Sequence, residues 1–134
     1  MSIPAVGFTS VTPNLVVRDV ATSLAFYRDV LGFAVKQTVP DHAPFVFVML
    51  ERGSVMVFLN DTGAAAHDLP LFATPHYGGT ATLFVVVDDV DTLHAQVAPR
   101  APVVMSLRTQ FYGMREFAIT DPDGHVITFA QRVG

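Results

Sequence analysis

The sequence predicts an α+β fold in which two tandem βαβββ modules form curved mixed sheets around a cavity. Two observations carry this prediction: several segments recur at one constant spacing, and apolar residues follow strand periodicity in some segments and helix periodicity in others. Apolar residues make up 51% of the 134-residue chain, and charged residues make up only 15%. This composition excludes a disordered chain, and the length fits a single domain with one shared core.

The internal repeat is clearest in two stretches, LVVRDVATSL from Leu15 and VVVDDVDTLH from Val85, which align with a shift of 70 positions. The same shift relates residues of further segments, pairing Asp19 with Asp89, Phe47 with Phe117, and Val57 with Ile127. Because one constant shift relates separate segments, we interpret the chain as two copies of one unit. Module one covers about 11–60 and module two about 80–131, and the stretch 61–79 connects them.

The first module is expected to begin with a strand at 12–18, followed by a helix at about 20–31. Asp19 stands where a helix N-cap belongs, because its side chain can accept hydrogen bonds from the first free amide groups, and Gly32 ends the helix. The buried stripe of this helix is predicted to consist of residues at helical spacing, namely Val20, Leu24, Tyr27 and Leu31. Further strands are expected near 35–39, 44–50 and 54–60.

The second module repeats this order. A strand at 80–87 leads to Asp89 as the N-cap of a helix at about 90–98, which stops before Pro99. Strands are expected near 103–107, 115–120 and 125–131. The turn Asp121-Pro122-Asp123-Gly124 joins the last two strands, since Pro presets φ and Gly permits a positive φ.

Side chains alternate across a strand, so each strand of the repeat offers two faces. One face is uniformly apolar and is predicted to lie against the helices: Val55, Val57, Leu59, Leu83, Val85, Val87, Ile127 and Phe129. The other face mixes hydroxyl, amide, aromatic and thioether groups: Thr12, Asn14, Val16, Met56, Phe58, Asn60, Thr82, Phe84, Val86, Val126, Thr128 and Ala130. This mixed face carries no Lys or Glu, so it suits a cavity that offers an apolar ligand a few hydrogen bonds. The alternative is an ordinary second core with satisfied hydroxyl groups.

Composition removes several classes of function. The chain has no cysteine, which excludes disulfides, thiol catalysis and zinc–thiolate sites. Its net charge of −4 and the lack of a Lys/Arg cluster argue against nucleic-acid binding. No apolar run reaches the roughly 18 residues of a membrane span, and the start MSIPAVGFTS lacks the basic region of a secretory signal. We therefore expect a cytoplasmic protein that binds neither nucleic acid nor membrane.

The stretches VTPNLVVRDVATSLAFYRDVLGF and FYGMREFAITDPDGHVITFAQ resemble the two signature ends of the vicinal oxygen chelate superfamily. This superfamily covers glyoxalase I, extradiol dioxygenases, fosfomycin-resistance enzymes and bleomycin-resistance proteins, and the resemblance spans nearly the whole chain. The aromatic-Gly-x-Arg-Glu-Phe run before Asp-Pro-x-Gly is most similar to the bleomycin-binding branch. The resemblance implies the glyoxalase/bleomycin-resistance fold and a homodimer with its ligand groove at or near the interface. Pro13 would mark an arm that crosses between subunits.

Enzymes of this superfamily hold a divalent metal with His, Gln or Glu at four strand positions. By motif alignment these positions fall here at Thr12, Phe58, Thr82 and Thr128, and the 70-residue shift relates them as two pairs. A neutral hydroxyl is a poor ligand for Zn, Fe or Mn, and Phe donates nothing. We therefore expect no metal, no other cofactor and no catalytic residue.

Twelve residues are candidates for ligand binding: Asn14, Phe45, Phe47, Met56, Phe58, Thr82, Phe84, Tyr112, Arg115, Glu116, Phe117 and Thr128. Tyr112 stands where bleomycin-binding relatives tend to carry Trp, so the resemblance implies a stacking ring there. An even-length hairpin at 121–124 would place Phe117 beside Thr128 on the cavity face. Its repeat mate Phe47 would then join Phe58, and Phe45 could share that face.

Two interpretations stay open for the neighbouring residues Arg115 and Glu116: a salt bridge that holds the strand, or a polar handle at the mouth of the pocket. The function predicted from the sequence is a metal-free small-molecule binding protein that sequesters an antibiotic or another planar apolar ligand. The alternative is a divergent lyase, isomerase or dioxygenase-like enzyme that uses Glu116, Tyr112 or His125 as acid or base. A ligand sensor or binding subunit is a third class. The expected partners are the small molecule and a second copy of the chain.

Overall fold

The computed structural model describes residues 5, 7–74 and 76–134, and it confirms the α+β class and the βαβββ order of both modules. Module one consists of β1 (Asn14–Val17), α1 (Val20–Ala25), the π-helical turn η1 (Phe26–Val30), β2 (Ala34–Val39), β3 (Phe47–Arg52) and β4 (Val55–Asp61). Module two consists of β5 (Thr82–Val86), α3 (Val90–Val97), the 3-10 turn η3 (Ala98–Arg100), β6 (Val103–Thr109), β7 (Met114–Thr120) and β8 (Val126–Arg132). Every predicted strand and helix is therefore present, with boundaries shifted by a few residues.

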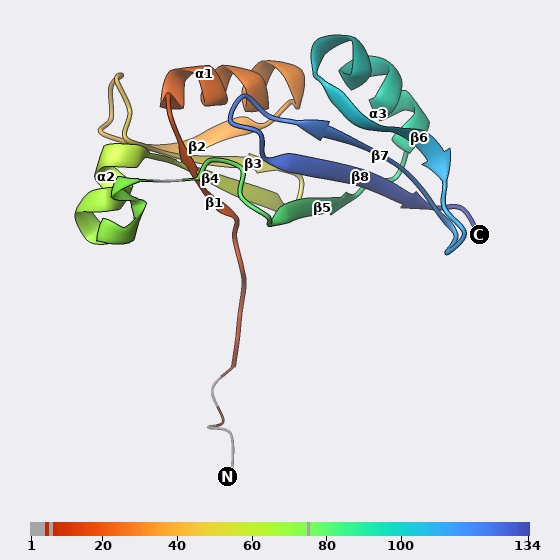
Figure 1. Cartoon of the computed structure of the whole chain (residues 1–134), viewed down its shortest axis with the longest axis horizontal. Coiled ribbons are helices and arrows are strands. Elements are labelled where there is room, and N and C mark those ends of the chain that lie inside the picture. Colours follow the sequence, from red (N-terminus) through yellow and green to blue (C-terminus); the bar gives the residue numbers. More distant parts are fainter. Residues whose placement is uncertain (1–4, 6, 75) are drawn as a thin grey trace.

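Each module forms one four-stranded sheet, in the orders β1-β4-β3-β2 and β5-β8-β7-β6. The first strand of each module pairs in parallel with the last strand, and the other pairs are antiparallel. The two sheets lie side by side, with α1 and α3 on the same face of both (Figure 1). One face of each sheet is thus covered by a helix, and neither α1 nor α3 covers the opposite face.

We call this opposite face the open face. In module one the strand register gives it Asn14, Val16, Phe47, Met49, Glu51, Met56, Phe58 and Asn60. In module two the register gives it Thr82, Phe84, Val86, Arg108, Met114, Glu116, Ala118, Thr120, Val126, Thr128, Ala130 and Arg132. Because residues directly opposite each other on paired strands project to the same side, this assignment follows from the pairing alone.

The helix-covered face holds the hydrophobic core. The predicted stripe of the first helix is buried, and Tyr27 at its centre is only 1% exposed. Except for Val55 at the start of β4, the apolar strand residues predicted for this face belong to the same cluster or pack against it, with Leu59 and Ile127 at 0% and 2% exposed. The periodicity argument therefore identified both halves of the core correctly.

The helix N-termini follow the predicted capping chemistry. The side chain of Asp19 accepts a hydrogen bond from the backbone N–H of Ala21 at 3.0 Å, and that of Asp89 accepts one from Thr92 at 3.1 Å. Hydrogen bonds from the Thr92 side chain and backbone lower the pKa of Asp89. The two modules thus begin their helices by the same device, as expected for copies of one unit.

The connector contains structure for which no helix was assigned from the sequence. It forms α2 (Thr62–Asp68) and the 3-10 turn η2 (Pro70–Ala73). Asp61 caps α2 by accepting a hydrogen bond from the N–H of Ala64 at 3.1 Å. None of the helices among the described residues is long and apolar enough to cross a membrane.

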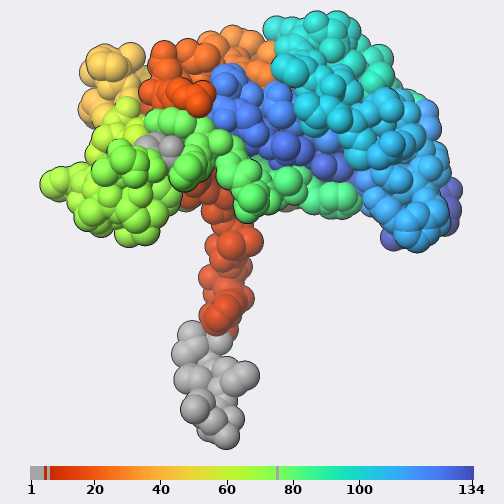
Figure 2. Space-filling model, viewed as in Figure 1, coloured from red at the N-terminus to blue at the C-terminus, as the bar shows by residue number. Residues whose placement is uncertain are grey.

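The segment of residues 7–13, before β1, leaves the body on the side away from α1 and α3 and stands clear of it (Figures 1 and 2). Its side chains Phe8 and Val11 are 100% and 95% exposed. It joins the body where the carbonyl oxygen of Pro13 accepts a hydrogen bond from the N–H of Phe58 at 2.9 Å. These residues project from the single chain, and the crossing of an arm at Pro13 to a second subunit stays a prediction.

Candidate functional site

The open face of module one gathers an aromatic pair and an amide pair. Phe47 and Phe58 meet edge to face with ring centroids 5.1 Å apart. Next to them, the side-chain amide of Asn60 donates a hydrogen bond to the side-chain oxygen of Asn14. Met56 lies on the same face of β4. The predicted meeting of Phe47 with Phe58 is confirmed, and these groups offer a ligand apolar area with a few hydrogen bonds.

The open face of module two is exposed along β5. Phe84 and Val86 on β5 are 56% and 66% exposed, although both are large and apolar. Thr82 at the start of β5 is also exposed, and Thr128 on β8 lies directly beside Phe84. An ordinary second core would bury these side chains, and in the single chain they are not buried.

A carboxyl group is buried in the middle of this same face. Glu116 on β7 is only 4% exposed. Its Oε1 accepts hydrogen bonds from the hydroxyl of Tyr112 at 2.5 Å and from Nε2 of Gln110 at 3.1 Å. The hydrogen bond to Glu116 raises the pKa of Tyr112. Its other oxygen, Oε2, is buried and has no hydrogen-bond partner among the described residues.

Three predicted site residues do not lie on the open face. Phe117 is fully buried on the helix side, where its ring contacts His94 and Phe129 at centroid distances of 5.0 and 5.3 Å. Phe45 lies before β3 and packs against the same core. Arg115 projects to the helix side as well. The expected position of Phe117 beside Thr128 on the cavity face is therefore wrong, and Phe45 and Arg115 do not share the open face.

The position of Phe117 follows from the length of a turn. Residues 53–54 separate the paired ends of β3 and β4, whereas residues 121–125 separate those of β7 and β8. The second turn is therefore of odd length, and the repeat shift changes by one between β3 and β7. A slip of one residue exchanges the two faces of a strand. As a result Glu116, and not Phe117, occupies the position in module two that Phe47 occupies in module one.

Arg115 and Glu116 do not pair with each other, because neighbouring residues on a strand face opposite sides. Arg115 instead forms an ion pair with Asp91 on α3, with Nη2 and Oδ1 3.1 Å apart. Arg115 thus takes the strand-holding role that was one of its two interpretations, with a different partner. Glu116 alone projects toward the open face.

The four positions that bind metal in the related enzymes offer no suitable donor set. Thr12 precedes β1 and Thr82 begins β5, while Phe58 and Thr128 lie within β4 and β8. Their side chains supply three neutral hydroxyl groups and one phenyl ring, which do not fit a divalent transition metal. Among the described residues, no group of three or more His, Cys, Asp or Glu side chains is arranged to hold a metal ion.

A buried polar network ties the two modules together on the helix side. Oδ1 of Asp121 accepts hydrogen bonds from the backbone N–H groups of Asp123 and His125, both at 2.9 Å. Its Oδ2 accepts one from the hydroxyl of Tyr27 at 2.8 Å and lies 2.8 Å from Nδ1 of His125. Burial by itself would raise the pKa of Asp121, but the hydrogen bonds from His125 and Tyr27 hold it below its ordinary value. Burial and the nearby Asp121 raise the pKa of Tyr27 far above its ordinary range.

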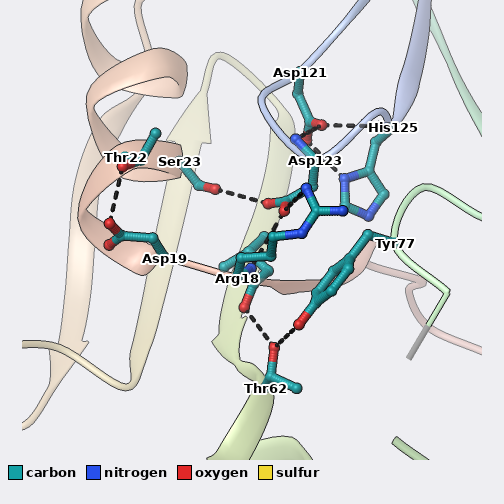
Figure 3. Close-up of polar contacts among 10 residues, drawn as sticks. Arg18, Asp19, Thr22, Ser23, Thr62, Tyr77, Asp121, Asp123 and His125 are labelled. Atoms are coloured by element: carbon teal, nitrogen blue, oxygen red, sulfur yellow. Dashed lines mark hydrogen bonds and ion pairs between the residues drawn. The ribbon is translucent and has the colours of Figure 1, made fainter. Parts of the chain in front are cut away.

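The network continues into module one and the connector (Figure 3). Asp123 accepts a hydrogen bond from the hydroxyl of Ser23 and pairs with the guanidinium of Arg18, each at 3.3 Å. That guanidinium lies 4.3 Å from the ring centre of Tyr77, whose hydroxyl is 2.7 Å from that of Thr62. This network was not predicted from the sequence. The available signal was Tyr27, since a tyrosine on a predicted buried stripe needs a partner for its hydroxyl.

A pocket of about 340 Å³ lies beside this network, where the edges of β1 and β5 meet the connector. Its lining includes Asn14, Phe72, Tyr77, Leu83 and His125. It does not include Phe58, Thr82 or Thr128, between which the sequence analysis placed the ligand cavity. In the single chain those residues lie on the open face, which a second surface would have to cover to form a closed cavity.

Comparison with known proteins agrees with this architecture. The family model of the Glyoxalase/Bleomycin resistance protein/Dioxygenase superfamily matches residues 7–129. Bleomycin resistance proteins from Geobacillus stearothermophilus and from Staphylococcus aureus (strain MRSA252) are 31% identical over 130 residues, covering 90% of this chain and 95% of theirs.

Two solved structures show the same fold at lower sequence identity. TioX from Micromonospora sp. ML1 is 22% identical with a TM-score of 0.73, over 94% of this chain and all 100% of its own. A glyoxalase/bleomycin resistance protein/dioxygenase from Nocardioides is 18% identical with a TM-score of 0.77, over 98% of this chain and 87% of its own. The predicted glyoxalase/bleomycin-resistance fold is confirmed.

Proposed function

The chain belongs to the glyoxalase/bleomycin resistance protein/dioxygenase superfamily, and on that premise we propose that it is a metal-free binding protein that sequesters a planar, largely apolar small molecule. The observation that carries the proposal is the open face. It combines exposed apolar side chains such as Phe84 and Val86 with hydroxyl and amide groups, and it holds no metal-ligand set at the family's four positions. The 31% identity to bleomycin resistance proteins makes an antibiotic of that kind the first ligand to test.

Sequestration follows from burial and stacking without any bond being made or broken. A flat ring placed against Phe84 would bury apolar area worth about 25 cal/mol per Å². Offset or edge contact with an aromatic side chain adds about 0.5–1.5 kcal/mol. Hydroxyl groups of Thr82 and Thr128 and the amides of Asn14 and Asn60 would fix the orientation of the ligand. A molecule held in this way is withdrawn from its target in proportion to the amount of protein.

We propose a homodimer in which a second copy covers the open face and completes the groove. Phe84 and Val86 on that face, together with Phe8 on the arm, are large apolar side chains that a single chain leaves exposed. Contiguous exposed apolar area of this kind marks interaction sites in soluble proteins. The arm projects on the same side as the open face, where it can reach a partner that docks there (Figure 1).

The hydrogen-bonded pair Tyr112 and Glu116 is the observation that favours the second candidate function, an enzyme of the same superfamily with an acid or base at this pair. The two functions differ in turnover. A binder returns the ligand chemically unchanged and protects only up to the amount of protein present, whereas an enzyme converts an excess of ligand.

The proposal is tested by calorimetric titration of chelator-treated protein with metal-free bleomycin, followed by mass spectrometry of the recovered ligand. We expect saturable binding of one ligand per chain, because a twofold dimer has two equivalent grooves, and unchanged ligand mass. Phe84→Ala should weaken binding roughly 5- to 50-fold through lost burial and ring contact. The matched control Leu71→Ala removes an apolar side chain of η2 that is 73% exposed and should bind normally. Failure to bind bleomycin or any planar aromatic compound, or conversion of the ligand, would contradict the proposal.

A further inference from the structure

We infer that Oε2 of Glu116 is the hydrogen-bond acceptor for an N–H group of the planar ligand, so that the protein selects aromatic molecules that carry a donor nitrogen on the ring. This inference rests on the proposed function, because it assigns the ligand class of the same open face. It starts from one atom. Oε2 of Glu116 is the one buried side-chain nitrogen or oxygen atom without a hydrogen-bond partner among the residues that the structure describes.

A buried carboxyl oxygen without a hydrogen-bond donor lowers the stability of the folded protein. Burying an acceptor without a donor loses its hydrogen bonds to water and gains nothing in return, and the loss is larger for a group that carries charge. A position in the middle of a sheet face would accept an apolar side chain at no such cost. Module one shows this, because the equivalent position there is Phe47, which packs on Phe58. A carboxyl group at this place therefore serves something other than packing.

The surroundings of Glu116 suit a flat ligand. Ala130, its direct neighbour on β8, has a side chain too short to reach the carboxyl group, and Val86 beyond it is 66% exposed. Phe84, which lies two positions before Val86 on β5 and beside Thr128, is 56% exposed. A ring lying over these side chains would bury them and bring its edge to Glu116. One ligand could therefore contact the apolar side chains and bond to Oε2 at the same time.

The turn between β6 and β7 supplies both hydrogen-bond donors to the carboxyl group. Gln110 and Tyr112, which both donate to Oε1, come from this turn, and Tyr112 is 46% exposed. Their donation to one oxygen fixes the carboxyl group and leaves the other for the ligand. Because Oε2 is buried in the single chain, the inference requires the half-exposed Tyr112 side chain to move aside when the ligand binds.

The other charged groups on this face are arginines. Arg108 on β6 is the direct cross-strand neighbour of Glu116 and is exposed, and Arg132 lies at the end of β8 with Nη1 3.5 Å from the carbonyl oxygen of Gly134. Neither forms an ion pair with Glu116 in the described part of the chain. Because two positive groups flank the site, positive charge on the ligand is insufficient by itself. The ligand must also carry an N–H group that donates a hydrogen bond to Oε2 of Glu116.

Three acridines of similar ring area distinguish the effect of an N–H donor on binding affinity from the effect of positive charge. Acridine at pH 8 is neutral and has no N–H group, and 10-methylacridinium is a cation without an N–H group. The cation of 9-aminoacridine carries N–H groups on both its ring nitrogen and its amino nitrogen. Fluorescence titration of the full chain should show 9-aminoacridine binding about 10- to 100-fold more tightly than either of the others, the range expected for one charge-assisted hydrogen bond. Glu116→Gln should reduce this preference to about 3-fold or less and leave acridine binding within about 2-fold of wild type.

Asp41→Asn is the matched control. Asp41 is exposed in the loop between β2 and β3 and lies outside the open face, so the variant makes the same change of charge away from the site. It should retain the full preference for 9-aminoacridine. If Glu116→Gln does not fold, Glu116→Asp takes its place, since the shorter side chain withdraws the carboxyl group from the ligand and should lower the preference in the same way.

Equal binding of 9-aminoacridine and 10-methylacridinium would overturn the inference, and so would a preference that survives in Glu116→Gln. In both cases acridine binding itself would leave the proposed function standing. Absence of binding by all three compounds would overturn the inference together with the proposal of a groove for planar molecules.

Discussion

The most informative pair of variants is Phe117→Ala and Phe47→Ala, because the two residues are repeat mates by sequence and lie on opposite faces by structure. Phe117 is 0% exposed and contacts two aromatic rings, His94 and Phe129. Phe47 is half-buried on the open face, where its one aromatic partner is Phe58. The same chemical change should therefore have very different costs.

For Phe117→Ala we expect a loss of about 3–5 kcal/mol in the free energy of unfolding, the range for a buried Phe truncated to Ala. The value should fall toward the upper end, because two ring contacts worth about 0.5–1.5 kcal/mol each are lost as well. For Phe47→Ala we expect about 1–2 kcal/mol, since one ring contact and only part of the apolar burial are removed.

Urea unfolding at one fixed protein concentration measures both values, and the fixed concentration matters because dimerisation adds to stability. Binding of a planar ligand, measured on the same samples, should weaken in Phe47→Ala and stay normal in folded Phe117→Ala. The assignment of faces is refuted if Phe47→Ala costs as much stability as Phe117→Ala. A loss below about 1.5 kcal/mol for Phe117→Ala would refute it as well.

Four further outcomes are expected. Tyr112→Ala should weaken binding of a flat ligand by roughly 1–3 kcal/mol, about 5- to 150-fold, while a denaturant melt shows a much smaller change, because the ring is 46% exposed. Tyr27→Phe should cost about 1.5–3 kcal/mol in a urea melt by removing a hydrogen bond to the carboxyl group of Asp121, and unchanged stability would disprove that contact. The pKa of Asp121 is held below its ordinary value, so its contribution is complete above the unfolded-state pKa of about 4 and is lost as pH falls through the lower folded-state value. Asp121→Asn should accordingly be much less stable than wild type at pH 7, and the difference should shrink as pH falls through the folded-state pKa of Asp121; a constant difference across pH would count against the network. Elemental analysis of chelator-free protein should find well under one Zn, Ni, Fe or Mn per chain, and stoichiometric metal would contradict the donor-set argument.

Alternation along single strands was enough to assign most of the fold and much of the site. Val57 and Leu59 on β4 face the helices, and Met56 and Phe58 face away from them, as the sequence indicates. This worked because each of these strands has one uniformly apolar face, so the pattern itself fixes the orientation. The N-cap residues could also be predicted from the sequence, because a capping side chain bonds to backbone N–H groups only two or three residues away.

Alternation alone could not predict which side chains of β7 point toward the helices and which point toward the open face. MREFAIT places buried residues on both sides of the strand, since Glu116 and Phe117 are both almost fully buried. Its orientation therefore depends on the number of residues in the turn at 121–125, and strand ends are the least certain part of a sequence reading. The error moved Phe117 to the wrong face. Opposite placement of Arg115 and Glu116 was by contrast available from the sequence, since adjacent strand residues always diverge.

The polar network and the acceptor at Glu116 depend on contacts that the sequence does not encode locally. Tyr27 and Asp121 are 94 positions apart. The free oxygen of Glu116 becomes visible only when its two donors, Gln110 and Tyr112, are both found on the other oxygen. Such features arise from packing between elements, which periodicity and spacing describe only in outline.

The central claim, that a planar ligand is held on the open face without a metal, is tested most directly by amide NMR. Chelator-treated, isotope-labelled protein would be titrated with metal-free bleomycin and the shift changes assigned along the chain. The account predicts saturable changes concentrated at the open face, around Phe84, Glu116 and Thr128, with little change at the pocket beside Tyr77 and His125. Changes centred on that pocket, or binding that appears only when a divalent metal is added, would contradict it.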